Sequence, residues 1–363
     1  TDMSKRRTFI KIFVILGLIL LVAGVAVFVG GMTAGGWDFS ILNTVRYTQK
    51  SYDAEGGVTS VHIEYSNAAI SVEYSETAER VHIDYPVRLN ERGEETAQIE
   101  ITEKDGALTV VEHVDWQDSL FQWDVDWQDS LFQWDIDLDF GDDSARAVRV
   151  VLPAGQNIAL DLYTQNGSVS LNADGEALPS LDLHSNNGSI SVSGTLTVAE
   201  DASFQTDNGS VKVSGVSAAG DLTLRTSNGS MRAENISADS LEARSSNGSL
   251  RLADIAAADS LTAKTNNGAI ELLGDITAKM LTVSTSAGDI AMHDGMIDAQ
   301  EIAMTTELGS IEAEGSAFAG AQSDYTVLVS TGLGESNVSD SVGGNRKLTL
   351  STGMGDIRVY FES

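Results

Sequence analysis

Cysteine is absent from this 363-residue chain, and proline occurs only 3 times. Without cysteine the protein can form neither a disulfide framework nor a thiolate metal site. Basic residues are also scarce, because 22 Lys and Arg stand against 53 Asp and Glu, for a formal net charge of −31. So acidic a chain is not expected to bind nucleic acid through its overall electrostatic field. The hydrophobic content of 42% nevertheless predicts a folded protein.

Charge is missing altogether from residues 12–32, which read IFVILGLILLVAGVAVFVGGM. A helix rising about 1.5 Å per residue would carry this run across the ~30 Å hydrocarbon core of a bilayer. The nearest cations all precede it: Lys5, Arg6, Arg7 and Lys11. The positive-inside rule therefore places the N-terminus in the cytoplasm and the later residues outside the cell. A cleaved signal peptide is the alternative, but the run is long and no clear A-x-A site follows it.

These features divide the first part of the chain. We expect residues 1–37 to be a cytoplasmic cationic start with a single-pass transmembrane anchor, and residues 38–57 to be a juxtamembrane linker. Beyond them we expect an irregular N-terminal β part over residues 58–152 and a repeated region over residues 153–363. The protein is then expected at the cell membrane, with an extracellular ectodomain.

The repeated region contains ten units of about twenty residues, of which TSNGSMR (residues 226–232) is one example. The units align on one glycine each: Gly167, Gly188, Gly209, Gly229, Gly248, Gly268, Gly288, Gly309, Gly334 and Gly355. The residues seven and five positions before each glycine are always apolar, and the residue three before it is always Thr or Ser. The second and fourth residues after it are apolar almost throughout, with Ser336 as the exception. This period-two alternation predicts half-buried strands on both sides of a turn.

One such unit cannot bury its apolar side chains alone, whereas stacked units form a continuous core. A sandwich or propeller would need antiparallel hairpins, and would not place the same residue types in the same phase ten times. We therefore predict an all-β protein, a parallel β-solenoid of about ten rungs of ~20 residues spaced ~4.8 Å apart, after one N-terminal transmembrane helix.

The residue just before the glycine has two interpretations, because Asn-x-Ser is also the acceptor sequence for N-glycosylation. It is asparagine in the first six units: Asn166, Asn187, Asn208, Asn228, Asn247 and Asn267. In the last four units it is apolar: Ala287, Leu308, Leu333 and Met354. An exposed glycan site would not be expected to change to Leu or Met. The exchange favours a structural corner on the inward parity, where stacked amides form a hydrogen-bonded ladder.

A second repeat interrupts the N-terminal part, where VDWQDSLFQWD at residues 114–124 recurs at 125–135. The alternation predicts a β-hairpin insertion over residues 114–140, although an eleven-residue period also fits three helical turns. The insertion contains four of the five tryptophans: Trp116, Trp123, Trp127 and Trp134. It is expected to cover an open edge of the solenoid, or to be an aromatic contact surface for sugar or the membrane interface.

The sequence contains no convincing catalytic or metal site. DIDLDFGDD at residues 135–143 resembles a calcium loop, but its glycine is misplaced and no glutamate closes it. The five histidines are scattered, and no nucleophile elbow or phosphate-binding loop occurs. We expect no cofactor and no catalytic residue. A β-helix carbohydrate-active enzyme is the less favoured alternative.

Two outward columns of basic residues flank the predicted corner. They comprise Arg225, Arg244 and Lys264 before the glycine, and Lys212, Arg232 and Arg251 after it. Stacked cations repel each other unless something neutralises them. Neighbouring acids such as Glu234 and Glu242 are one source of neutralisation. The other is a ligand, in which case these six residues form an anion-binding patch for phosphate-bearing polymer or lipid headgroups.

The cationic start and apolar run, VHIEYSNAAISVEY, the aromatic and acidic stretch, VRVVLPAG at residues 148–155 and the T-x-NGS units together resemble a bacterial envelope family labelled "putative adhesin". The resemblance implies a single-pass surface protein with a β-solenoid ectodomain, on an envelope of Gram-positive type, and brings no catalytic residues. The expected function is a non-catalytic surface adhesion or binding module for cell-wall polymer, glycan or envelope protein. An envelope-stress or regulatory ectodomain is the alternative.

Overall fold

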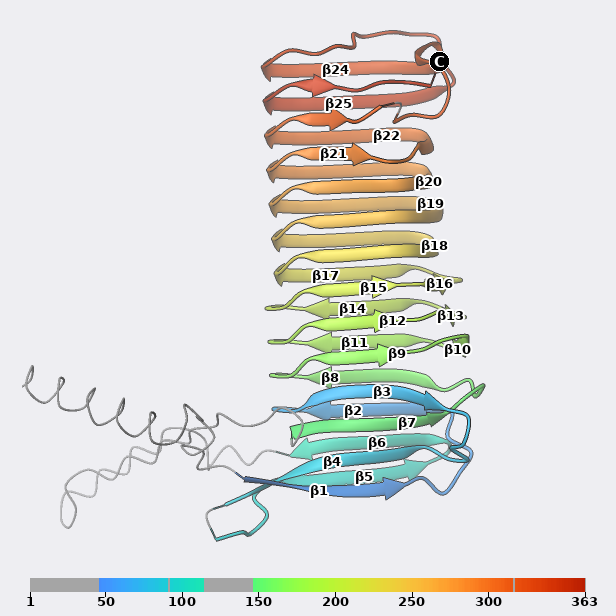
Figure 1. The fold of residues 1–363 in the computed structure, drawn as a ribbon, viewed down its shortest axis with the longest axis vertical. Helices are drawn as coiled ribbons and strands as arrows, with labels where there is room; N and C mark the ends of the chain where they lie inside the picture. The colour runs from blue at the N-terminus through green and yellow to red at the C-terminus, as the bar shows by residue number, and fades with distance from the viewer. Residues whose placement is uncertain (1–45, 91, 114–145, 316, 363) are drawn as a thin grey trace, which may run out of the picture.

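The computed structural model describes residues 46–90, 92–113, 146–315 and 317–362. They form an all-β parallel solenoid of about nine turns, close to the ten rungs predicted (Figure 1). These ranges contain almost no helix, and η4 (Gln322–Asp324) is a single 3-10 turn. The repeated alternation therefore forms stacked strands, as the sequence predicts.

Each turn has three faces. The first face is built from strands that precede the glycine: β8 (Ala159–Thr164), β11 (Leu181–Ser185), β14 (Ala202–Thr206) and β17 (Leu222–Asn228). The second face follows the glycine: β9 (Val169–Asn172), β12 (Ile190–Ser193) and β15 (Val211–Ser214). The third face is short: β10 (Glu176–Leu178), β13 (Leu196–Val198) and β16 (Val216–Ala218). Equivalent strands pair in parallel and in register, so that Leu181 lies between Leu160 and Ala202.

In the middle turns the strands run on through the bends. Three of them pass from the second face, through the third, to the first face of the next turn: β18 (Met231–Asn247), β19 (Leu250–Asn267) and β20 (Ile270–Ala287). Their inward residues form one continuous core with those of the other turns. Beyond them come β21 (Ile290–His293), β22 (Ile297–Leu308) and β23 (Ile311–Ala313).

The glycine of each unit is required by close backbone stacking at the corner between the first and second faces. A Cβ placed on Gly229 would lie 1.9 Å from the carbonyl oxygen of Gly209 in the turn below. The same collision recurs along the column, with Gly248 against Gly229 and Gly355 against Gly309. No side chain fits at such a distance, so this position admits only glycine.

The Thr or Ser three residues before each glycine donates a hydrogen bond to a backbone carbonyl at the same corner. Thr226 is buried, and its Oγ1 donates a hydrogen bond of 2.8 Å to the carbonyl oxygen of Gly209. Ser245 makes the equivalent bond to Gly229 at 3.0 Å. Because a buried carbonyl without a partner is costly, the hydroxyl column and the glycine column together fix the corner.

The N-terminal part belongs to the same stack. β2 (Ser60–Tyr65) pairs with β8, and β3 (Ala69–Ser75) pairs with β9, so residues 60–75 form the first turn. β6 (Ala107–His113) and β7 (Ala147–Pro153) extend the two faces in parallel. Antiparallel strands end the stack: β5 (Gln98–Lys104) on β6, β4 (His82–Leu89) on β7, and β1 (Arg46–Asp53) on β4.

Two features of these strands bear on the expected boundaries. Residues 46–53 form the edge strand β1, although the sequence analysis placed them in a linker. They alternate poorly because an edge strand with few buried residues needs no apolar face. Strands from both sides of residue 153 also pair with each other, β2 with β8 and β3 with β9.

The C-terminal end departs from sequential stacking. β25 (Arg346–Met354) pairs with β22 on one side and with β24 (Tyr325–Leu333) on the other, so the later unit lies between the two earlier ones. β26 (Ile357–Arg358) follows on the second face. Tyr325, Phe318 and Phe361 close the core, with ring centroids 5.4 to 6.3 Å apart.

The predicted anchor at residues 12–32 and the predicted hairpin at residues 114–140 lie outside the described residues. Within the residues that are described, no helix has the length and apolar character needed to cross a membrane.

Candidate binding groove

An open groove of about 460 Å³ runs along the first face, beside the corner. It crosses the turns that contain β11, β14, β17, β18 and β19, and is thus parallel to the solenoid axis. Two rows of outward side chains define it. We call this hollow the lateral groove.

The outer row of the lateral groove lies four residues before each glycine. It consists of His184, Gln205, Arg225, Arg244 and Lys264, which are in register on adjacent strands. Parallel pairing places equivalent side chains about 4.8 Å apart, so the three cations form a short stack. Below them His184 packs edge-on against Tyr163, with ring centroids 5.1 Å apart.

One carboxylate serves two of these cations. Arg225 Nη2 donates to Glu242 Oε2 at 2.6 Å, and Arg244 Nε donates to the other oxygen, Glu242 Oε1. Burial acts to raise the pKa of the Glu242 carboxyl, but the hydrogen bonds and charges of the two arginines outweigh it and lower this pKa below its usual value. Lys264 forms no ion pair with any described residue. The stack therefore has more positive than negative charge.

The inner row of the lateral groove lies two residues before each glycine and was not singled out by the sequence analysis. It presents Asp207, Ser227, Ser246 and Asn266. These residues share one offset from the glycine, and this spacing was the signal that could have identified them. In this row the amide and hydroxyl groups can donate and accept hydrogen bonds, and the carboxylate of Asp207 can accept them.

The asparagine column borders the inner row and forms a continuous chain of side-chain hydrogen bonds. Asn228 Nδ2 donates to Asn208 Oδ1 at 2.9 Å, and Asn247 Nδ2 donates to Asn228 Oδ1 at 2.9 Å. The chain extends from Asn267 down to Asn67 in the first turn. We call these residues the asparagine ladder: Asn67, Asn166, Asn187, Asn208, Asn228, Asn247 and Asn267.

The asparagine ladder is exposed, which corrects the expected inward parity. Inward positions at this corner are occupied by the buried Thr and Ser three residues before the glycine. Each ladder amide between the two ends uses one donor and one acceptor within the column, which leaves its second N–H and second lone pair available. The ladder thereby holds a regular row of polar groups in fixed rotamers beside the groove.

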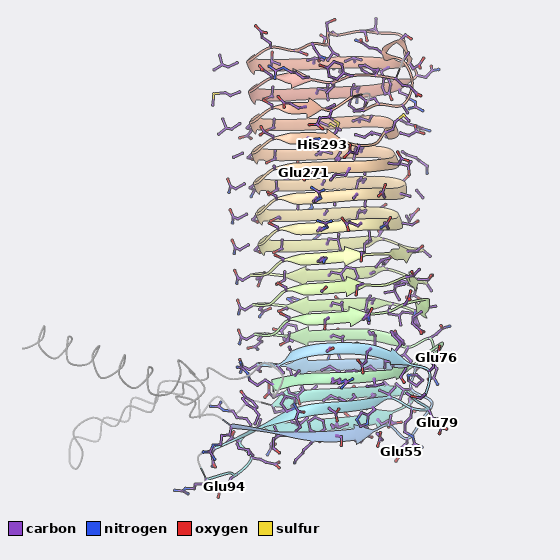
Figure 2. All side chains as sticks on the ribbon, viewed as in Figure 1. Glu55, Glu76, Glu79, Glu94, Glu271 and His293 are labelled. Carbon is purple, nitrogen blue, oxygen red and sulfur yellow. The ribbon has the colours of Figure 1, made fainter. Side chains whose placement is uncertain are left out.

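The other three basic residues lie elsewhere. Lys212, Arg232 and Arg251 project from the second face, on β15, β18 and β19, and do not line the lateral groove. Arg232 pairs with Glu234, and Arg251 Nη1 donates at 2.5 Å to Glu271, which Figure 2 shows on that face. The six predicted cations thus form two sets of three on opposite sides of the corner.

A second hollow of about 440 Å³ lies lower on the first face. His62 Nδ1 is 2.8 Å from Asp161 Oδ2, and Asp182 is the neighbour of Asp161 on the next strand. Burial, and then the charge of Asp161, raises the pKa of the Asp182 carboxyl, while Ser203 opposes the shift. Across the described ranges, no three His, Asp or Glu side chains are arranged to hold a metal ion. The tryptophans proposed as an aromatic surface lie outside those ranges.

The chain is similar to a protein family and to solved structures. A family model described as Toastrack DUF4097 matches residues 58–273, which is more than half of the chain. A crystal structure of a "putative adhesin" from Bacteroides fragilis is 14% identical and covers 74% of this chain and 97% of its own, with a TM-score of 0.38. A "putative cell adhesion protein" from Clostridium sporogenes is 9% identical and covers 87% and 100%, with a TM-score of 0.19. No curated protein matches the chain.

Proposed function

The chain belongs to the Toastrack DUF4097 family, and we propose that its solenoid is a non-catalytic binding module at the outer surface of a bacterial cell. Its ligand is a phosphate-bearing polyhydroxylated polymer of the envelope, which lies along the lateral groove. Residues 12–32 tether the module to the membrane.

The excess of positive charge in the lateral groove is the observation that carries this proposal. Three cations, Arg225, Arg244 and Lys264, line the groove against two carboxylates, Glu242 and Asp207. Arg225 and Arg244 share Glu242, and Lys264 has no acidic partner among the described side chains. Such an excess is unusual on a chain with a formal charge of −31. Guanidinium groups are suited to phosphate because they offer two parallel N–H donors.

The repeat of the groove favours a polymer over a small ligand. Its two rows and the asparagine ladder recur at the strand spacing of about 4.8 Å along the solenoid axis. A polymer of repeating units can therefore meet equivalent donors and acceptors over several turns. The ladder is preorganised by its own hydrogen bonds, which reduces the conformational entropy lost on binding.

The second face provides a matched control for the test. Arg225→Ala with Arg244→Ala removes two cations from the groove, and Arg232→Ala with Arg251→Ala removes two cations from the same turns on the other face. The full chain in zwitterionic nanodiscs is titrated with poly(glycerol phosphate) by calorimetry at low salt. Uncharged dextran serves as the control polymer.

The groove pair is expected to weaken phosphate polymer binding by about 10-fold or more, and the control pair by less than about 3-fold. Binding by the wild type should also weaken as salt rises. Equal losses in the two variants would show that cations on both faces contribute alike, and would contradict a site in the lateral groove. Unchanged affinity in the groove variant would end the proposal.

The proposed tether has a separate test. Residues 12–32 carry no charge, and the cations near them all precede them. The full chain should stay with membranes during an alkaline carbonate wash, and should keep its N-terminus. Release into the supernatant, or a mature N-terminus after residue 30, would contradict the tether while leaving the groove untouched.

A further inference from the structure

Exposed apolar side chains are gathered at the C-terminal end of the solenoid. Above Asn267 the ladder position is occupied by Ala287, Leu308, Met354 and Leu333, which follow one another in register. Leu308 is 50% exposed, Met354 49% and Leu333 68%. We call these three residues the apolar strip. Contiguous exposed apolar side chains on a protein surface commonly mark an interaction site.

The backbone next to the apolar strip leaves it uncovered. The inner-row position is glycine in the two uppermost turns, at Gly332 and Gly353, so no side chain folds over Met354 or Leu333 there. Both glycines lie close to backbone, since a Cβ would be 2.5 Å from a carbonyl oxygen at Gly332 and 2.6 Å at Gly353. The exposure of the strip is therefore built into the corner.

Carboxylates border the apolar strip. Glu307 precedes Leu308, Glu335 lies two residues after Leu333, and Asp289 lies at the foot of the strip. No described cation pairs with any of the three, although Arg358 pairs with the nearby Asp356. In the six lower units the positions equivalent to Glu335 and Asp289 are uncharged: they are serines such as Ser210 and Ser230, and Ala269 in the sixth. Negative charge thus accompanies the apolar residues along this part of the corner.

We propose that the apolar strip is a docking site for a basic amphipathic helix of a partner protein. An α-helix rises about 5.4 Å per turn, which is close to the ~4.8 Å between turns of the solenoid. A helix that lies along the corner can therefore place about one apolar residue on each of the three strip residues. Its lysines or arginines then meet the bordering carboxylates. A second copy of this chain is disfavoured by its own acidity, and an anionic lipid surface by the same carboxylates.

The apolar strip can be removed by substituting its residues with asparagine, which already occupies the same corner position in the lower turns. Leu308→Asn, Leu333→Asn and Met354→Asn together place at these positions the residue that the asparagine ladder already carries. Leu328→Asn changes an apolar residue of 46% exposure outside the strip and is the matched control. Far-UV circular dichroism and urea unfolding establish that each variant is folded.

The probe is a fluorescent amphipathic peptide of Leu and Lys with its leucines on one helical face, and its counterpart has Glu in place of Lys. Binding to the full chain in zwitterionic nanodiscs is measured by anisotropy, with empty nanodiscs subtracted. The Leu and Lys peptide should bind the triple variant about 10-fold more weakly than the wild type or the Leu328 control. The Leu and Glu peptide should bind none of them.

Equal binding of the Leu and Lys peptide to the wild type and the triple variant would overturn the proposal, as would equal binding of the two peptides. Two further outcomes would also overturn the proposal, because they would show that something other than a basic helix binds the apolar strip. One is a dimer, seen by sedimentation, that the triple variant loses. The other is adherence to added phosphatidylcholine liposomes that the triple variant loses.

Discussion

The lower and upper parts of one corner share a backbone and differ in their surface. From Asn166 to Asn267 the residue before the glycine is an exposed amide in a hydrogen-bonded ladder, and from Ala287 to Leu333 it is apolar. The glycine column continues through both parts, since a Cβ added at Gly229 or at Gly334 would lie 1.9 Å from a carbonyl oxygen. The fold therefore dictates the glycine and leaves its neighbour open to selection for binding.

The largest effect on stability is expected at the glycine, which occurs in both the lower and the upper part of the corner. Gly229→Ala would place a Cβ 1.9 Å from the Gly209 carbonyl oxygen, which the stacked backbone cannot accommodate. We expect a loss of more than about 4 kcal/mol in the free energy of unfolding, or no folded protein. Gly175→Ala is the control, because that glycine has positive φ but open space where a Cβ would stand, and should cost only about 1–2 kcal/mol. Similar losses in urea unfolding would refute the steric explanation.

The second-largest loss of stability is expected when the buried hydroxyl of Thr226 is removed. Thr226→Val keeps the shape of the side chain but removes the donor to the Gly209 carbonyl oxygen. An unpartnered buried carbonyl costs about 1–3 kcal/mol. Thr223→Val, on the outward side of the same strand, should change the urea midpoint little. A neutral Thr226 variant would show that water replaces the hydroxyl.

A smaller effect is expected in the asparagine ladder itself. Asn228→Asp can still accept from Asn247 but can no longer donate to Asn208, so a loss of about 0.5–1.5 kcal/mol is expected at neutral pH. The loss should shrink below about pH 4, where a protonated carboxyl donates again. Asn228→Leu, which copies the upper turns, should also remain folded. A loss above about 3 kcal/mol for either variant would contradict an exposed, replaceable position.

The smallest effect is expected for Ser230→Ala, which removes the glycosylation sequence and only an exposed hydroxyl. Its urea midpoint should match that of the wild type. Intact mass should fall only by the one oxygen atom. Loss of a sugar-sized mass would instead support the glycan interpretation.

The sequence was sufficient to predict the solenoid because the same local rules recur in every unit. Apolar residues seven and five positions before each glycine predict strands, and Leu222 and Leu224 are indeed buried. The family resemblance is confirmed by the match over residues 58–273. Repetition makes such predictions strong, because a wrong period would fail in most units.

Other features depend on contacts that no local pattern encodes. The unit at residues 346–358 resembles the unit before it, so nothing in its residues indicates that it inserts between β22 and β24. The side of the corner on which the asparagines lie depends on a bend, where the period of two no longer applies. For the same reason, the sequence joined Arg225 and Arg232 in one patch although they project from different faces.

The central claim, that the corner fixes its glycines and leaves the neighbouring residue free, is tested most directly by the urea unfolding of the triple variant Leu308→Asn, Leu333→Asn and Met354→Asn. The three side chains are about half exposed or more, and the new amides can form ladder bonds. We therefore predict a free energy of unfolding within about 2 kcal/mol of the wild type. A loss of more than about 4 kcal/mol would show that the apolar residues hold the upper turns together, and would contradict the claim.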